Sequence, residues 1–222
     1  MAERRPKQII SVVGPKLFQP VAALVAKPIA RPYPPSDGVG SSFDEVGYSA
    51  AIIILLAAVV DSIVQRDCHF YLGPGATTKS WSGGAADYAK SVLRYRRHAH
   101  LLEFFDVRNS VAHNHLWEID FTTPSGGGRR HTDSRIVEGT HRLRVLPTSR
   151  TQIARTKRLR LNVQPNRVCR TDVAKAFSAI LHFSAHISRH DHNPIQQASA
   201  GLRLQGKPVL FSDLLPALKG SF

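Results

Sequence analysis

Two side chains that can act together on a phosphate group occur in one short segment of the chain. Arg108 is followed after four residues by His113, in the sequence Glu-Phe-Phe-Asp-Val-Arg-Asn-Ser-Val-Ala-His. Histidine titrates near neutral pH and can transfer protons, whereas arginine stays protonated and binds two phosphate oxygens at once. Metal-free cleavage of RNA needs a base for the 2′-hydroxyl, an acid for the leaving 5′-oxygen and a cation for the developing charge.

Spacing alone is a weak signal, because Arg and His are both frequent in this chain. Similarly spaced pairs are Arg94/His100, Arg135/His141 and Arg108/His115. Context separates Arg108 and His113 from these, because an apolar stretch leads into the segment and a helix is expected there. Arg135/His141 falls in an expected strand, and Arg94/His100 crosses an expected helix end.

The segment resembles the RxxxxH motif of HEPN domains, small helical bundles found in many bacterial toxins, defence proteins and CRISPR effectors. Asn109 directly after the arginine, the small residue Ala112 before the histidine and the apolar lead-in are all usual for that motif. So is its position at the start of a helix late in the bundle. The resemblance covers about residues 44–190.

The resemblance implies an activity and partners. It implies a metal-independent endoribonuclease that leaves a 2′,3′-cyclic phosphate, with Arg108 and His113 as its catalytic pair and no cofactor. A role as a toxin or defence effector would add an acidic inhibitor or antitoxin as a partner. The alternative is a HEPN-like subunit without catalysis, an RNA-binding or scaffold protein in which both residues only bind phosphate or a partner.

Three further residues are candidates for supporting roles. HEPN proteins often carry an acidic or polar residue on an early helix that orients the motif, and Asp61 is placed to take that role. A partly exposed carboxylate at a helix end is an equally good interpretation. Asn109 lies next to the motif arginine. His115 is either an aid to phosphate binding or a surface histidine, at a position where some family members carry a modifiable Tyr.

The geometry of an ideal helix restricts how the pair can act. At 100° per residue, Arg108 and His113 project about 140° apart, whereas Asn109 and His113 lie about 40° apart. One regular helix therefore does not point both catalytic candidates at the same phosphate. Either Arg108 lies in a frayed first turn, or two chains share the site. HEPN nucleases commonly use the second arrangement, so we expect a homodimer.

A second group of histidines raises the question of a metal. His182, His186 and His190 recur every four residues, and two His at this spacing can bind zinc. They share a polar helix face with Lys175 and Arg189, which is typical of a solvated surface. We therefore expect no metal site, and a metal hydrolase is the third and weakest functional hypothesis.

The charge of the chain is strongly positive and unevenly distributed. The formal net charge is +14, and residues 108–170 hold thirteen Lys or Arg against four Asp or Glu. This composition attracts polyanions such as RNA. The residues expected to bind RNA phosphates are Arg129, Arg130, Arg142, Arg144, Lys157, Arg158 and Arg160. Few aromatic residues interleave with them, so stacking on bases is not expected.

The hydrophobic pattern predicts a mainly α-helical protein, with about four main helices in a bundle. A helix at residues 44–66 is apolar almost all round and should form the centre. A second helix is expected at 85–100, a third from about 106 to 119, and the last at about 171–190. Val173, Phe177 and Ile180 define the apolar face of the last helix.

The other segments complete the expected organisation. A basic β-hairpin, from strands within 134–146 and 156–163, is inserted before the last helix, in a region spanning about 121–166. Residues 1–42 are rich in Pro and Gly and predict an irregular arm with at most a short helix near 17–25. The helical domain then spans 43–193, and 194–222 form a C-terminal extension.

Cysteine content and hydropathy predict the compartment. Cys68 and Cys169 are far apart and form no CxxC pair, which predicts neither a disulfide framework nor a thiolate zinc site. No signal peptide is expected from the interrupted apolar start. The longest uncharged stretch, 46–60, is shorter than the roughly 20 residues that cross a bilayer. The sequence therefore predicts a cytoplasmic protein without a membrane partner.

Overall fold

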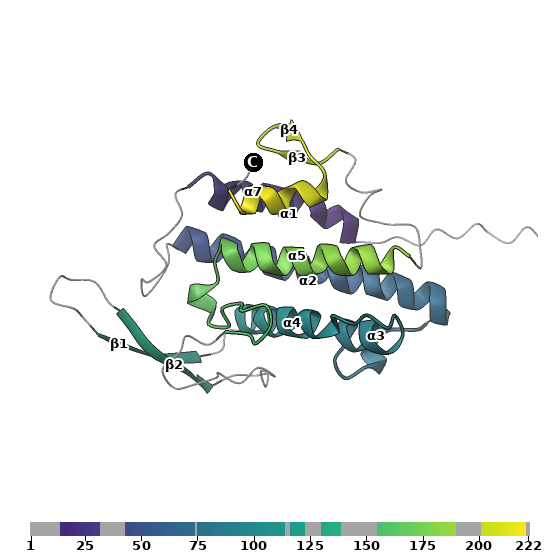
Figure 1. The fold of residues 1–222 in the computed structure, drawn as a ribbon, viewed down its shortest axis with the longest axis horizontal. Helices are drawn as coiled ribbons and strands as arrows, with labels where there is room; N and C mark the ends of the chain where they lie inside the picture. The colour runs from purple at the N-terminus through teal and green to yellow at the C-terminus, as the bar shows by residue number, and fades with distance from the viewer. Residues whose placement is uncertain are drawn as a thin grey trace, which may run out of the picture.

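A computed structural model describes residues 14–31, 43–73, 75–113, 116–122, 130–138, 155–189 and 201–220, with the backbone alone for 43, 80, 116–122 and 130–138. This part of the chain is mainly helical, which confirms the predicted α class. The helices lie in three layers (Figure 1). These are α1 (Phe18–Ile29) with α7 (Leu214–Leu218), α2 (Phe43–Leu72) with α5 (Arg170–Ile187), and α3 (Ala85–Ser91) with α4 (His98–Ala112).

Helix α2 forms the centre of the bundle because apolar residues cover almost its whole circumference. Ile52, Ile53, Leu56 and Val60 are fully buried, and α2 contacts α1, α3, α4 and α5. The predicted central helix is therefore confirmed, and it continues to Leu72. By length and composition alone α2 would also be able to cross a membrane. In this structure its buried residues belong to the protein core.

The helix that carries the Arg/His segment differs from the prediction at both ends. A single helix at 85–100 is wrong, because α3 ends at Ser91 and a turn with Arg94 at a positive φ of 53° follows. Helix α4 then begins at His98. The physical reason is burial: Leu101 and Phe104 are fully buried, and they reach the core only if this segment is already helical.

Helix α4 also ends earlier than expected. Its last residue is Ala112, and His113 is the C-cap residue, so the expected continuation to 119 is wrong. Arg108 consequently lies in the last turns of a helix rather than in a frayed first turn. The residues after α4 alternate between apolar and acidic side chains at 117–121, a period of two that favours a strand.

A β-hairpin follows α4, but with strands other than those predicted. Strand β1 (Leu116–Thr122) pairs antiparallel with β2 (Arg130–Glu138). Only β2 overlaps the expected strand within 134–146. Residues 155–162 form a turn closed by an isolated bridge between Arg155 and Asn162, so the expected second strand is wrong. The carboxylate of Glu103 on α4 holds this turn by accepting the backbone N–H groups of Arg158 and Leu159.

Segments near both ends of the chain contribute to the core. The region expected to be an irregular arm contains α1, a full helix whose Phe18, Val21 and Val25 are buried. The segment 201–220 carries a short hairpin of β3 (Arg203–Leu204) and β4 (Lys207–Pro208), followed by α7. The Phe18 ring stacks on Phe211 at 4.0 Å between centroids, which joins the two segments.

Helix α5 matches the predicted last helix, and a buried ion pair links its start to α2. Val173, Phe177 and Ile180 are buried, as the apolar face predicts. The guanidinium of Arg170 contacts the Glu45 carboxylate at 2.7 Å, and both side chains are almost fully buried. The backbone N–H of Arg170 also donates to Glu45 at 2.7 Å.

We expect Glu45→Gln to lower the free energy of unfolding strongly. The substitution leaves the Arg170 guanidinium buried without its counter-charge, and breaking such a pair costs about 3–5 kcal/mol. Asp44→Asn is the matched control, because Asp44 pairs with Arg31 at the surface, where ion pairs contribute about 1 kcal/mol or less. Urea unfolding of both variants measures the difference. Equal decreases in the free energy of unfolding of the two variants would show that the buried pair does not hold α2 and α5 together.

Candidate functional site

Helices α2 and α4 bring three of the predicted site residues to one small cavity. Asp61 comes from α2, and Arg108 and Asn109 come from α4. The cavity has a volume of about 310 Å³, and its wall opposite the helices is the turn 82–85 before α3. Asp61 is far in sequence from the adjacent Arg108 and Asn109, so tertiary packing brings it to them.

Arg108 is held at this cavity by two weak contacts. Its guanidinium lies 4.0 Å from the Asp61 carboxylate and 5.4 Å from the centre of the Phe105 ring. The Arg108 side chain is 29% exposed and that of Asp61 48%. The Nε of Arg108 is buried and has no hydrogen-bond partner among the described residues. A cation with a free donor at a polar cavity can bind an anion.

The environment of Asp61 acts on its ionisation in two opposing ways. Burial raises the pKa of the carboxyl group, because the charged form loses hydration. The neighbouring Arg108 lowers it by stabilising the carboxylate, but burial has the larger effect and the pKa of Asp61 is raised overall. The two residues are therefore coupled electrostatically, which is what an orienting role for Asp61 requires.

The turn that walls the cavity was not recognised from the sequence as part of a site. The N–H of Gly83 and the hydroxyl of Ser82 both donate to the Asp87 carboxylate, at 2.7 and 3.1 Å. Gly84 adopts a φ of +58°, in the region that favours glycine. A Gly-Gly pair is typical of a loop, and Asp87 four residues after Gly83 is the acceptor that closes this turn.

His113 does not line this cavity. It is exposed, at the C-cap of α4 with φ −109° and ψ 17°. Its side chain leaves the helix end, whereas Arg108 lies more than a turn earlier beside Asp61. A single chain therefore does not gather both catalytic candidates in the cavity. His115 lies outside the described residues.

Two buried contacts fix the end of α4. Ser110 is fully buried and donates its hydroxyl to the Val163 carbonyl at 2.5 Å. Glu103 is almost fully buried and accepts the N–H groups of the turn 155–162. Sequence reasoning gave neither residue a role. Both join α4 to the turn that carries predicted phosphate-binding residues.

The predicted RNA-binding residues are only partly within the described structure. Lys157, Arg158 and Arg160 are exposed and share the turn that Glu103 holds. Arg160 has a positive φ of 56°, and its carbonyl accepts the Lys175 ammonium at 3.1 Å. Arg130 is the first residue of β2, described by its backbone alone. Arg129, Arg142 and Arg144 lie outside the described residues.

The two described histidines of the α5 series make contacts within the fold. Nδ1 of His182 lies 3.1 Å from the Tyr95 hydroxyl, and Nε2 of His186 donates to the Leu93 carbonyl at 2.8 Å. Burial lowers the pKa of His182. His190 lies outside the described residues. No group of three or more His, Cys, Asp or Glu able to hold a metal occurs in the part of the chain that the structure describes.

Comparison with known proteins adds no family assignment. The chain has no significant match among models of protein families, curated proteins or solved structures. The resemblance to HEPN domains therefore depends on the motif and its context alone.

We expect Arg108→Gln to raise the pKa of Asp61 further. Gln keeps much of the bulk around the carboxyl group but removes the positive charge that lowers its pKa. Arg108→Lys is the matched control and should keep much of that effect. Carbon-13 NMR titration of the Asp61 carboxyl group measures its pKa in the wild type and in the two variants. An Asp61 pKa that is the same in all three proteins would show that the two side chains do not interact.

Proposed function

We propose that this protein is a metal-independent endoribonuclease of the HEPN type, in which Arg108 and His113 act on the scissile phosphate. The observation that carries the proposal is the partly exposed side chain of Arg108 at the polar cavity that it shares with Asn109 and Asp61. A partly exposed guanidinium at a cavity is available for a phosphate oxygen. The basic turn 155–162, joined to α4 through Glu103, supports RNA as the source of that phosphate.

The chemistry follows from the two residue types. His113 takes the proton from the 2′-hydroxyl, or gives one to the 5′-oxygen as it leaves, since imidazole serves as a general base or a general acid. The 2′-oxygen bonds to phosphorus as the bond to the 5′-oxygen breaks, which gives a 2′,3′-cyclic phosphate. Arg108 neutralises the charge that builds on the two non-bridging oxygens. Asp61 positions the guanidinium.

The separation of the two residues supports a site shared between two chains. Arg108 lies beside Asp61, and His113 lies at the helix end outside the cavity. A homodimer with a two-fold axis near the end of α4 would bring the His113 of each chain towards the Arg108 of the other chain. Such a dimer would have two identical sites. His113 is exposed at the end of α4, at the surface where the second chain and RNA would approach.

The position of His113 also favours a second function. If no second chain completes the site, Arg108 remains a phosphate-binding residue without a proton-transfer partner in the cavity. The protein is then a HEPN-like RNA-binding or scaffold subunit. Cleavage assays distinguish the two functions, because both bind RNA and only the first breaks it.

We expect His113→Ala and Arg108→Ala each to lower RNA cleavage by about 100-fold or more, because each removes a group needed in the transition state. His69→Ala and Arg96→Ala are matched controls outside the cavity and should retain activity. Wild-type cleavage should persist in EDTA and leave a 2′,3′-cyclic end. Electrophoresis of an end-labelled RNA measures each rate.

Loss of wild-type cleavage in EDTA would point instead to a metal hydrolase. Salt-dependent RNA binding with no cleavage by the wild type would establish the non-catalytic alternative.

Mixing two inactive variants tests whether each site is shared between two chains. If Arg108 and His113 of each site come from different chains, inactive Arg108→Ala and inactive His113→Ala proteins should regain cleavage when their chains exchange. One of the two sites in a mixed dimer then has both intact residues. Activity should approach about a quarter of wild type, since about half of randomly exchanged dimers are mixed. A wild-type protein that is monomeric by light scattering and fully active would contradict the shared site.

A further inference from the structure

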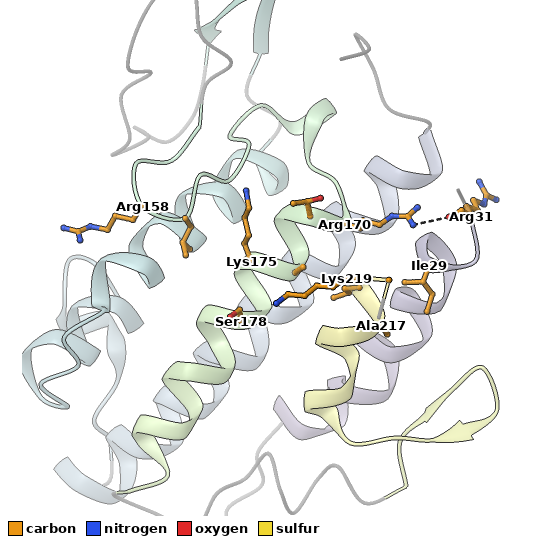
Figure 2. A pocket seen from close by; sticks show the side chains of 13 residues that line it. Ile29, Arg31, Arg158, Arg170, Lys175, Ser178, Ala217 and Lys219 are labelled. Carbon is orange, nitrogen blue, oxygen red and sulfur yellow. Dashed lines mark hydrogen bonds between the residues drawn. The ribbon is translucent and has the colours of Figure 1, made fainter. Parts of the chain in front are cut away.

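A second and larger cavity lies on the other side of the turn 155–162 from α4, between the ends of α1 and α7 and the first half of α5 (Figure 2). Its volume is about 790 Å³, within the range of roughly 300–1,000 Å³ typical of small-molecule sites. None of its lining residues lines the Arg108 cavity. The larger cavity is therefore a separate site.

The walls of this cavity are aliphatic. Ile29, Leu159, Ala174, Ala217 and Leu218 supply apolar side chains from four different segments, and among the described residues no Phe, Tyr, Trp or His lines the cavity. Apolar walls of this kind favour a hydrocarbon chain through burial of its surface. They offer no ring on which a nucleic-acid base can stack.

The polar residues of the cavity are predominantly cationic. Arg31 and Arg170 are neutralised by Asp44 and Glu45. The other three cations, drawn in Figure 2 on three different segments, are Arg158, Lys175 and Lys219. Within the described part of the chain no Asp or Glu lines the cavity, and no carboxylate there lies within ion-pair distance of these three.

We propose that this cavity binds an amphipathic anion, an aliphatic chain that ends in a carboxylate or a phosphate monoester. The aliphatic walls receive the chain, and Lys175 and Lys219 receive the head group, whereas the guanidinium of Arg158 points away from these two lysines and adds only to the positive charge around the cavity (Figure 2). Two uncompensated cations beside an apolar surface are complementary to this ligand class, and they repel a cationic amphiphile of the same length. The proposal does not depend on the ribonuclease function, because the two cavities share no lining residue among those the structure describes.

Isothermal titration calorimetry of the full chain, below the micelle concentration of each probe, tests the proposal. Decanoate and decyl phosphate should bind once per chain, and their relative affinities distinguish the two head groups. Decanol and decyltrimethylammonium, which have the same chain length, should bind at least about tenfold more weakly, because each lost charge-assisted contact is worth about 1.4 kcal/mol or more. Binding should also show a negative heat-capacity change from the buried chain.

Two variants connect the binding to this cavity. Lys219→Gln should weaken binding of both anions about tenfold, since it removes one cation from the rim. Ser178→Trp should abolish binding, because Ser178 lines the cavity from an exposed position on α5 where a large ring fills space without disturbing the core. Lys90→Gln, at an exposed position on α3 that does not line the cavity, is the control and should bind like the wild type.

Several results would overturn the proposal. Decanol or decyltrimethylammonium binding as tightly as decanoate would show that the cations do not select the ligand. Inorganic phosphate binding as tightly as decyl phosphate would show that the apolar walls are not used. Displacement of decanoate by a short RNA would show that the cavity is part of the RNA-binding surface. If protein that is shown to be folded by its cooperative unfolding binds neither decanoate nor decyl phosphate, the proposal is also overturned.

Discussion

A thirty-residue helix with apolar side chains on nearly every face is stable in water only when other elements enclose it, and α2 imposes this requirement on the whole chain. Helices α1, α3, α4 and α5 all pack against it. Segments from near both ends of the described chain complete the enclosure, with Phe18 and Phe211 stacked at their junction. The buried pair of Glu45 and Arg170 aligns the start of α2 with the start of α5.

The candidate site arises where this apolar helix becomes polar. Asp61 follows Val59 and Val60, so the packing that buries these two valines also brings the carboxylate towards α4. Burial disfavours its charged form, and Arg108 is the neighbouring cation that offsets part of that cost. The Arg108 side chain remains partly exposed where it lines the cavity. Packing thus places a partly exposed arginine at the site.

The end of α4 separates two groups that the motif places only five residues apart. Because the helix stops at Ala112, His113 leaves the helical path and becomes exposed, while Arg108 stays beside Asp61. The contacts of Ser110 with Val163 and of Glu103 with the turn 155–162 keep the end of α4 in place. A fixed separation of this kind suits a site completed by a second chain better than one closed by movement within a single chain.

The sequence by itself determined the α class, the central apolar helix, the apolar face of the last helix and the candidate residues, because hydrophobic periodicity and side-chain chemistry are local properties. The sequence pattern misplaced the ends of α4 and the hairpin strands. Helix and strand patterns compete in these segments, and the residues that become buried in the common core, such as Leu101 and Phe104, decide between them. The proximity of Asp61 to Arg108, the exposure of His113 and the cation-rimmed aliphatic cavity were decided only by tertiary structure. Each depends on segments distant in the chain meeting in space, and no local pattern encodes those distances.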